Sequence, residues 1–249
     1  MVPKGLFFHL GQYYILMGKV FAKPEKHKLY YRQFIKEVMS LGVSSLGIVA
    51  IISAFMGAII TIQTAYNIQN PLLPNYLIGV AARDSIILEF SSTIVGLILA
   101  GKVGSSIASE LGTMRVSEQI DALEIMGVNS AGYLILPKIL AAVFFNPFLT
   151  LMSMTVGIIG GWAVGSYVGV INTQQYIYGI QYGLTLYYIS YSVTKAAVFA
   201  FIITSIAAYY GYNVEGGSTE VGRASTKAVV YSSVVILLFN LLLTQLILS

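Results

Sequence analysis

The sequence predicts an all-α membrane protein that crosses the bilayer several times. Hydrophobic residues make up 57% of the 249 residues and charged residues only 10%, and the mean hydropathy is +0.79. Residues 38–82 and 139–194 carry no formal charge, and both runs exceed the roughly 20 residues that a membrane-spanning helix needs. The alternation typical of a membrane barrel strand is missing. A soluble core could not absorb such runs, so we expect a polytopic helical bundle.

Residues 1–40 form the first predicted region, an amphipathic segment in the membrane interface. Its apolar face comprises Leu6, Phe7, Leu10, Tyr13, Tyr14 and Met17, and the nearby basic residues are Lys4, Lys19, Lys23, Lys26, Lys28, Arg32 and Lys36. This pattern is typical of a helix lying on anionic lipid. An ordinary amphipathic lead-in and a specific lipid-recognition element both fit it. No small-residue cleavage pattern follows a compact apolar core, so we expect the segment to be retained.

Residues 41–249 form the second predicted region, which contains five spans. The expected spans are residues 41–66, 76 or 85 to 101, 139–165, 188–210 and 228–248. The first two are separated by an Asn- and Pro-rich turn (Asn67, Asn70, Pro71, Pro74 and Asn75) that cannot continue a helix. Pro147 predicts a kink in the third span.

The distribution of basic residues predicts the orientation of the chain. Seven Lys and Arg residues precede the first span, three lie in residues 102–138 and two in residues 211–227, whereas the alternate loops hold only Arg83. Connecting segments rich in Lys and Arg stay in the cytoplasm. We therefore expect a cytoplasmic amino terminus and a carboxyl terminus on the outer side.

The connecting segment 102–138 contains an acidic, polar helical stretch between two apolar runs. Its acids are Glu110, Glu118, Asp121 and Glu124, accompanied by Arg115 in the middle and Lys102 at the margin. Such a shaped, charged surface suits docking to another protein better than solvation alone. The alternative is a solvated helix stabilised by local pairs such as Arg115 with Glu118.

Two charged residues, Glu89 and Lys195, fall inside predicted spans. A lone ionised group in hydrocarbon is unfavourable by at least about 2.5 kcal/mol, so each should face a cavity, a partner or a lipid headgroup. A role in headgroup binding or gating and a plain ion pair that locks two helices are both compatible with the sequence.

An apolar stripe runs along the first predicted span. Phe55, Met56, Ile59, Ile62 and Tyr66 recur there at helical spacing and offer a wall for acyl chains. Core packing against neighbouring helices explains the same spacing, and we expect it for most of these side chains.

A stripe of small residues runs along the third predicted span. Gly157, Gly161, Gly165 and Gly169 repeat every four residues, so another helix can approach at backbone distance. The spacing fits an internal contact and a homodimer seam equally well.

Several kinds of chemistry lack the necessary residues. The chain has no Cys, which excludes disulfides and thiolate ligands. It has no GxxxxGK[ST] loop, so ATP hydrolysis is expected in a separate subunit. His9 and His27 both precede the first span, so no catalytic acid–base pair or metal cluster is visible. We expect a protein that is not an enzyme and that has no cofactor.

Three sequence stretches resemble one known family. AGKVGSSIASELGTMRVSEQIDALEIMGV at 100–128 is similar to the signature of MlaE-type permeases, which serve lipid-transporting ABC systems that contain MCE proteins. SLGVSSLGIVAIISAFMGAIITIQTAY at 40–66 resembles the first span of that family. GYNVEGGSTEVGRASTKAVVYSS at 211–233 resembles its last cytoplasmic loop.

The resemblance implies a homodimeric permease in the bacterial inner membrane, with phospholipid as substrate. Its partners would be an ATP-binding ABC subunit, an MCE-domain protein and a small STAS-type protein, with no nucleic acid. It also implies a coupling helix within residues 113–126, where Arg115, Glu118, Asp121 and Glu124 would transmit nucleotide-driven motion. A lipid-binding or gating role would fall to Glu89 and Lys195, and the apolar wall would comprise Phe55, Ile59, Ile62 and Tyr66.

Two other functions remain open. DALEIMG followed by Leu136 and Pro137 faintly resembles the coupling loop of ABC solute importers, although the spacing is shorter. An intramembrane lipid-modifying enzyme would have only Asp84, Glu89 and Lys195 near membrane depth. Transport direction and headgroup preference do not follow from the sequence.

Overall fold

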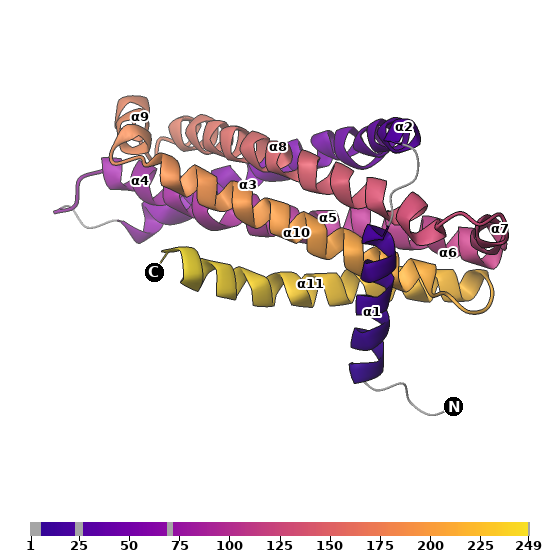
Figure 1. Cartoon of the computed structure of the whole chain (residues 1–249). Helices are drawn as coiled ribbons and strands as arrows, with labels where there is room; N and C mark the ends of the chain where they lie inside the picture. Colours follow the sequence, from indigo (N-terminus) through magenta and orange to yellow (C-terminus); the bar gives the residue numbers. More distant parts are fainter. Residues whose placement is uncertain (1–5, 23–26, 69–71, 249) are drawn as a thin grey trace. The chain divides into compact units, whose positions relative to one another are not determined.

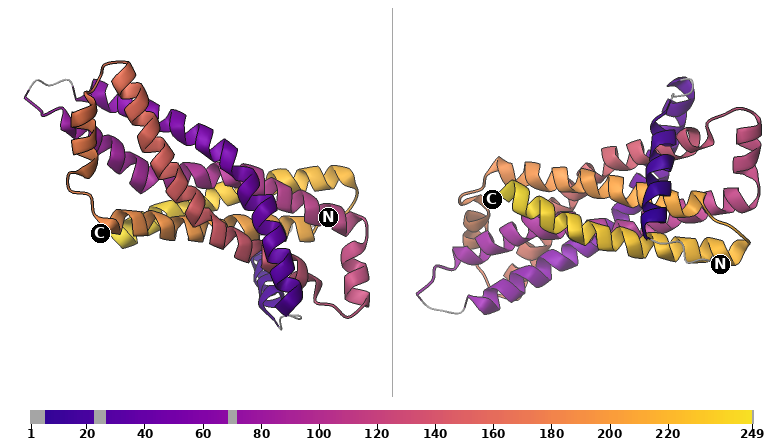
Figure 2. Two further views of the ribbon diagram at one scale, coloured as in Figure 1. Left: turned by 90° about the horizontal axis from the view of Figure 1, so that it is seen from above. Right: turned by 60° about the horizontal axis from the view of Figure 1, so that its bottom comes forward.

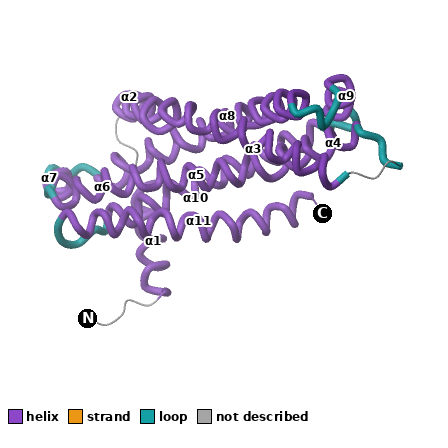
Figure 3. The backbone as a smooth tube through the Cα atoms, turned by 180° about the vertical axis from the view of Figure 1, so that it is seen from behind, coloured by secondary structure: helices purple, strands orange, loops and turns teal. Residues whose placement is uncertain are grey.

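The computed structural model describes residues 6–22, 27–68 and 72–248. Helices make up most of these residues and no strand occurs among them (Figure 3). Some residues of the sequence predictions lie outside the described ranges, namely Lys4, Lys23, Lys26, Asn70 and Pro71.

The helices follow one another with few interruptions (Figure 1). The first half of the chain contains α1 (Leu6–Phe21), α2 (His27–Glu37), the π-helix η1 (Val38–Gly42), the 3-10 turn η2 (Val43–Ser45), α3 (Leu46–Asn67), α4 (Tyr76–Ser85), the π-helix η3 (Ile86–Ile94), α5 (Val95–Leu99) and the π-helix η4 (Ala100–Gly104). The second half contains α6 (Ser105–Val116), α7 (Gln119–Ile125), α8 (Ser130–Tyr167), α9 (Thr173–Gln181), α10 (Leu186–Tyr212) and α11 (Ser218–Leu248).

Within the described residues, five continuous helical stretches are long and apolar enough to cross a membrane. They are Tyr30–Asn67, Tyr76–Val116, Ser130–Tyr167, Leu186–Tyr212 and Ser218–Ile247. The predicted all-α polytopic fold with five spans is therefore confirmed.

The helices extend beyond the ends of the predicted spans. The second stretch continues as α6 to Val116, and α8 begins at Ser130 and runs through Pro137 and Pro147. The predicted spans were taken from hydropathy, which indicates only the part of a helix inside the apolar layer. The helix itself continues until its backbone hydrogen bonds end. The segment predicted as a connecting loop, residues 102–138, is consequently mostly helix.

The chain divides into two compact units. Unit 1 comprises Met1–Val43, Leu99–Phe145 and Val198–Phe239, and unit 2 comprises Ser44–Ile98, Asn146–Ala197 and Asn240–Ser249. Each unit combines three separate parts of the chain.

In unit 1, α1 is fastened by its polar and apolar side chains together. Tyr13 donates a hydrogen bond to Ser205 of α10 at 2.9 Å, and His9 Nδ1 lies 2.8 Å from the hydroxyl of Tyr209. Leu16 and Val20 are buried on the same helix. The remaining apolar face, including Phe7 and Tyr14, stays exposed, as expected for a helix in a membrane interface.

Unit 1 also contains a cluster of three charges around a buried lysine, which we call the Lys138 triad. The Lys138 ammonium lies 2.7 Å from Glu37 and 2.7 Å from Glu110, and its side chain is only 3% exposed. The triad joins α2, α6 and α8. A buried cation needs such partners because water no longer solvates it.

In unit 2, α3 and α8 touch at backbone distance (Figure 2). A Cβ at Gly57 would overlap the carbonyl oxygen of Gly157, and one at Gly161 would meet Thr61 of α3. The glycine stripe therefore serves an internal contact, apart from Gly169, which lies beyond the end of α8 with a φ of +76°.

The short helix α9 is fixed to α4 by Arg83. This side chain is 2% exposed and donates to the carbonyls of Ile180 at 2.8 Å and Tyr182 at 2.7 Å. These carbonyls belong to the last turn and the end of α9, where a helix leaves its acceptors unpaired. Arg83 also pairs with Asp84 at 2.8 Å.

Candidate functional site

The intramembrane acid Glu89 lies on η3, a π-helix of nine residues. π-Helical segments are rare and occur frequently at functional sites, because their wider turn redirects side chains. Here the local geometry places Glu89 beside α10 and the last turns of α11, all within unit 2.

Lys195 of α10 pairs with Glu89. Its Nζ lies 3.0 Å from Oε1 of Glu89 and also donates to the hydroxyl of Tyr191 at 3.0 Å and, at 3.4 Å, to Thr244. The Lys195 side chain is fully buried. The sequence was compatible with a role in headgroup binding or gating and with an ion pair that locks two helices, and the structure shows that the two residues form an ion pair.

Glu89 differs from its partner because it is 40% exposed. Its carboxylate accepts hydrogen bonds from Asn240 at 3.1 Å, Thr244 at 3.2 Å and Thr93 at 3.1 Å. We call these six residues the Glu89 cluster: Glu89, Thr93, Tyr191, Lys195, Asn240 and Thr244. The cluster is electrically neutral, and its acid is held from one side while part of it stays open.

Sequence reasoning missed the four neutral members of the Glu89 cluster. Each lies four residues from another member on the same helix, as Thr93 does from Glu89, Tyr191 from Lys195, and Asn240 from Thr244. Polar residues at this spacing in apolar runs share one helical face. The Asn240 and Thr244 pair, within LLFNLLLTQL, was the signal that could have revealed a third helix of the site.

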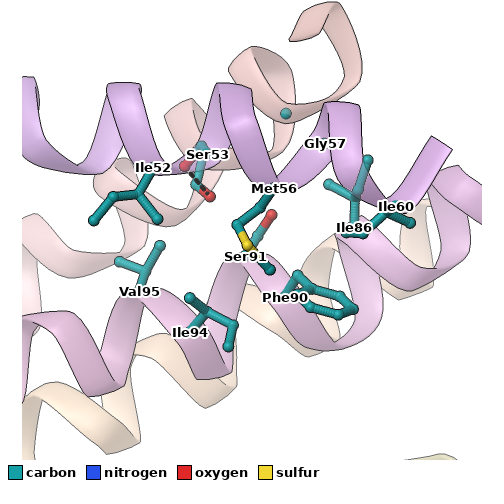
Figure 4. Close-up of a pocket in the computed structure, with 12 residues that line it drawn as sticks. Ile52, Ser53, Met56, Gly57, Ile60, Ile86, Phe90, Ser91, Ile94 and Val95 are labelled. Carbon is teal, nitrogen blue, oxygen red and sulfur yellow. Dashed lines mark hydrogen bonds between the residues drawn. The ribbon is translucent and has the colours of Figure 1, made fainter. Parts of the chain in front are cut away.

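A small cavity of about 10 Å³ lies between α3 and η3 in unit 2, and it is lined by Met56, Phe90 and Ser91 (Figure 4). This volume is close to the minimum for one water molecule. The Ser91 hydroxyl is buried and has no hydrogen-bond partner in the described part of the chain. Nearby, Ser53 donates to Ser153 at 2.8 Å.

The side chains of the predicted apolar wall do not line this cavity. Phe55, Ile59 and Tyr66 are 67%, 53% and 64% exposed, and Ile62 is half-buried. Met56 alone of the stripe lines the cavity. The expectation of core packing is wrong for the three exposed side chains, because helical spacing identifies a stripe but not what covers it.

The acidic segment folds into α7, which follows a sharp reversal. Glu118 has a φ of 58°, a left-handed conformation that is unusual for a residue with a side chain. Arg115 consequently pairs with Asp121 at 2.5 Å and not with Glu118, the local partner considered from the sequence. Ile125 and Met126, at the end of α7, are 87% and 67% exposed.

Glu124 connects α7 to two long helices within unit 1. Its carboxylate accepts hydrogen bonds from Tyr212 of α10 at 2.8 Å and from Ser130 of α8 at 2.9 Å. These bonds lower the pKa of Glu124 below its ordinary value, because they favour the ionised form. Of the four predicted coupling residues, Arg115 and Asp121 form one pair, Glu124 forms this second contact, and Glu118 sets the turn.

Comparison with known proteins places this fold in the class of ABC transporter permeases. A "Probable ABC transporter permease protein" of Rickettsia bellii is 37% identical over 95% of this chain and 91% of its own. The "Intermembrane phospholipid transport system permease protein MlaE" of Haemophilus influenzae is 29% identical over 93% of this chain and 88% of its own. "Protein TRIGALACTOSYLDIACYLGLYCEROL 1, chloroplastic" of Arabidopsis thaliana is 34% identical over 93% of this chain and 66% of its own.

The family model described as "Permease MlaE" matches residues 34–246. The chain therefore belongs to the MlaE permease family and is a multi-pass transport subunit, as the sequence motifs indicated.

Proposed function

We propose that this permease moves phospholipid between membranes, together with a separate ATPase and an MCE-domain protein, in a bacterial inner membrane. The observation that carries the proposal is the Glu89 side chain, 40% exposed, paired with a fully buried Lys195. The name of the Haemophilus influenzae relative supports lipid as the transported class.

The Glu89 cluster has the chemistry needed to hold a polar headgroup within the apolar layer. A headgroup amine or hydroxyl that replaced one of the neutral donors Thr93, Asn240 or Thr244 would bond to the Glu89 carboxylate, while Lys195 balances the charge. If Lys195 turned from Glu89, its ammonium would present a cation to a phosphate. Such an exchange of partners is a physical basis for binding in one state and release in another.

The exposed end of α7 suits docking to the ATPase. Ile125 and Met126 offer an apolar knob, and the bonds of Glu124 to Tyr212 and Ser130 connect that knob to α10 and α8. A displacement of α7 would then be transmitted through these bonds to α8 and α10 within unit 1. The basic-residue distribution supports a cytoplasmic position for α7.

A second copy of the chain fits the exposure of α11. Only 11% of its most apolar window is buried within one chain, and a homodimer would cover part of the remainder. A small STAS-type protein is a further proposed member of the assembly.

The function is tested by lipid transfer from proteoliposomes that contain the complete assembly. For Glu89→Gln we expect at least about a tenfold loss of transfer, because the charge that binds Lys195 is removed. The matched control is Asp84→Asn, another acid of unit 2 with similar exposure, 34% against 40%. Equal transfer by both variants would overturn the assignment of Glu89.

The ATPase contact is tested by reversing two charges on the reversal and on α7. For the double variant Glu118→Lys and Asp121→Lys we expect loss of ATPase stimulation or of ATPase binding, because the Arg115 pair breaks. Unchanged stimulation would overturn the docking proposal. Purification from the native membrane distinguishes the alternatives, since an importer would bring down a soluble solute-binding protein, and a lipid-modifying enzyme would bring down no ATPase.

A further inference from the structure

A second polar pocket lies in unit 1, where the Glu89 cluster has no residue. Its volume is about 210 Å³, and it is lined by α1, the end of α10 and the beginning of α11. One water needs roughly 10–15 Å³ on this scale, and drug-sized ligands occupy about 300–1,000 Å³. The pocket is therefore large enough for a group of several heavy atoms, such as a lipid headgroup, but small for a whole lipid.

One side of this pocket carries two cations. Arg223 and Lys227 lie one turn apart on α11 and both line the cavity. Arg223 uses Nη1 for an ion pair with Glu220 at 2.6 Å and remains 72% exposed. Lys227 has no hydrogen bond or ion pair to any residue that the structure describes. These donors match the oxygens of a phosphate group.

The same pocket also contains features that suit an amine. Glu215 and Glu220 line it together with the rings of Tyr209 and Tyr210. Carboxylates pair with an ammonium, and tyrosine faces attract one. Two acids and two bases leave the pocket without net charge when His9 is neutral, which favours a zwitterion over a simple anion.

The wall contributed by α1 is held in place by hydrogen bonds. Tyr209 donates to Oε1 of Gln12 at 3.2 Å, and its hydroxyl lies 2.8 Å from His9. Both α1 residues line the pocket, while Phe7 on the same helix is 87% exposed. The pocket is thus built into a helix with the character of a membrane interface.

An apolar surface adjoins the charged side. A wider hollow shares Arg223 and Lys227 with the pocket and is also lined by Val230 and Tyr231, which are 53% and 49% exposed. A ligand held by the two cations could therefore lay apolar chains along α11. We propose that the pocket binds a phospholipid through a zwitterionic phosphate–amine headgroup, of the phosphatidylethanolamine type, at the membrane surface.

The test is native mass spectrometry of the delipidated full-length protein, titrated with phosphatidylethanolamine. The double variant Arg223→Gln and Lys227→Gln should bind one equivalent about tenfold more weakly. The matched control is Arg32→Gln and Lys36→Gln, which removes two exposed cations from α2 of the same unit and should bind normally. An equal loss in both doubles, or no loss in the first, would overturn the proposal.

Further ligands and one background variant identify the source of the headgroup. Glu215→Gln with Glu220→Gln should remove the preference for phosphatidylethanolamine over phosphatidylglycerol, because only the former has an amine. Binding of soluble glycerophosphoethanolamine without binding of the lipid would overturn a lipid occupant. In a Glu89→Gln background, the Arg223→Gln and Lys227→Gln substitutions should still weaken phosphatidylethanolamine binding. The pocket proposal can therefore hold even if the transport proposal fails. Loss of the effect in that background would contradict a separate site.

Discussion

Unit 1 and unit 2 each bury one lysine within the described residues of their helices, and the two ammonium groups are neutralised differently. Lys138 lies between two carboxylates, Glu37 and Glu110, at equal distances of 2.7 Å. Lys195 has one carboxylate, Glu89, at 3.0 Å, and its other bonds go to neutral oxygens. The Lys138 triad thus has a net negative charge, whereas the Glu89 cluster is neutral.

This difference indicates that the Lys138 triad holds helices together, whereas the Glu89 cluster can exchange hydrogen-bond partners. If Lys138 moved away, two like charges, Glu37 on α2 and Glu110 on α6, would remain without a cation between them. A change of partners in the triad is therefore unfavourable. In the Glu89 cluster, hydroxyl and amide groups of Thr93, Thr244 and Asn240 share the bonding to the acid. Neutral partners can be exchanged at lower free energy than a full charge.

The largest expected effect comes from Lys138→Met. We expect the free energy of unfolding to fall by about 3 kcal/mol, since breaking a buried ion pair leaves its partners uncompensated. Exposure of Glu110, at 48%, keeps the loss from being larger. Thermal unfolding in detergent, compared with Lys36→Met on exposed α2, measures the effect. Equal free energies of unfolding for the two variants would show that the triad does not stabilise the packing of α2, α6 and α8.

A smaller effect is expected from Thr244→Val in the Glu89 cluster. Its hydroxyl bonds to Glu89 at 3.2 Å and to the carbonyl of Asn240 at 2.7 Å, so its removal should destabilise the protein by about 1 kcal/mol. Lipid transfer should fall more than stability, because Glu89 loses a group that orients it. The control is Thr155→Val, an exposed residue that bonds only within its own helix in the structure described. A transfer rate as high as that of the control would contradict the positioning role.

The sequence predicted the five spans and the acidic segment because both depend on local composition. It also predicted that Glu89 and Lys195 needed partners, since the energetics of a charge in hydrocarbon do not depend on the fold. It could not predict that Asn240 joins them, because that contact depends on which helices meet. The exposed side of Phe55 was missed for the same reason, and the turn at Glu118 depends on a backbone conformation that its residue type does not favour.

The smallest expected effect concerns Glu124, the acid that ties α7 to the helices of unit 1. Hydrogen bonds from Tyr212 and Ser130 lower its pKa below the ordinary value of 4.5. The ionised form therefore stabilises the folded protein fully above pH 4.5, and this contribution is lost as the pH falls through the lowered pKa. Because Glu124 is exposed, we expect a contribution on the order of 0.5 kcal/mol after solvent screening.

Amide hydrogen exchange of α7, corrected for the intrinsic pH dependence of exchange, measures that contribution. In the unmodified protein, protection of residues 119–125 should decrease between pH 4.5 and pH 3, whereas Glu124→Gln should remove this dependence. The matched control is Glu118→Gln, for which the described structure shows no polar side-chain contact, and it should keep the dependence. A loss of dependence in the Glu118 variant as well would mean that the charge of the whole turn, and not the bonds of Glu124, holds α7. The hydrogen bonds of Glu124 to Tyr212 and Ser130 would then not be what holds α7. The proposed transmission of motion from α7 to α10 would lose its support.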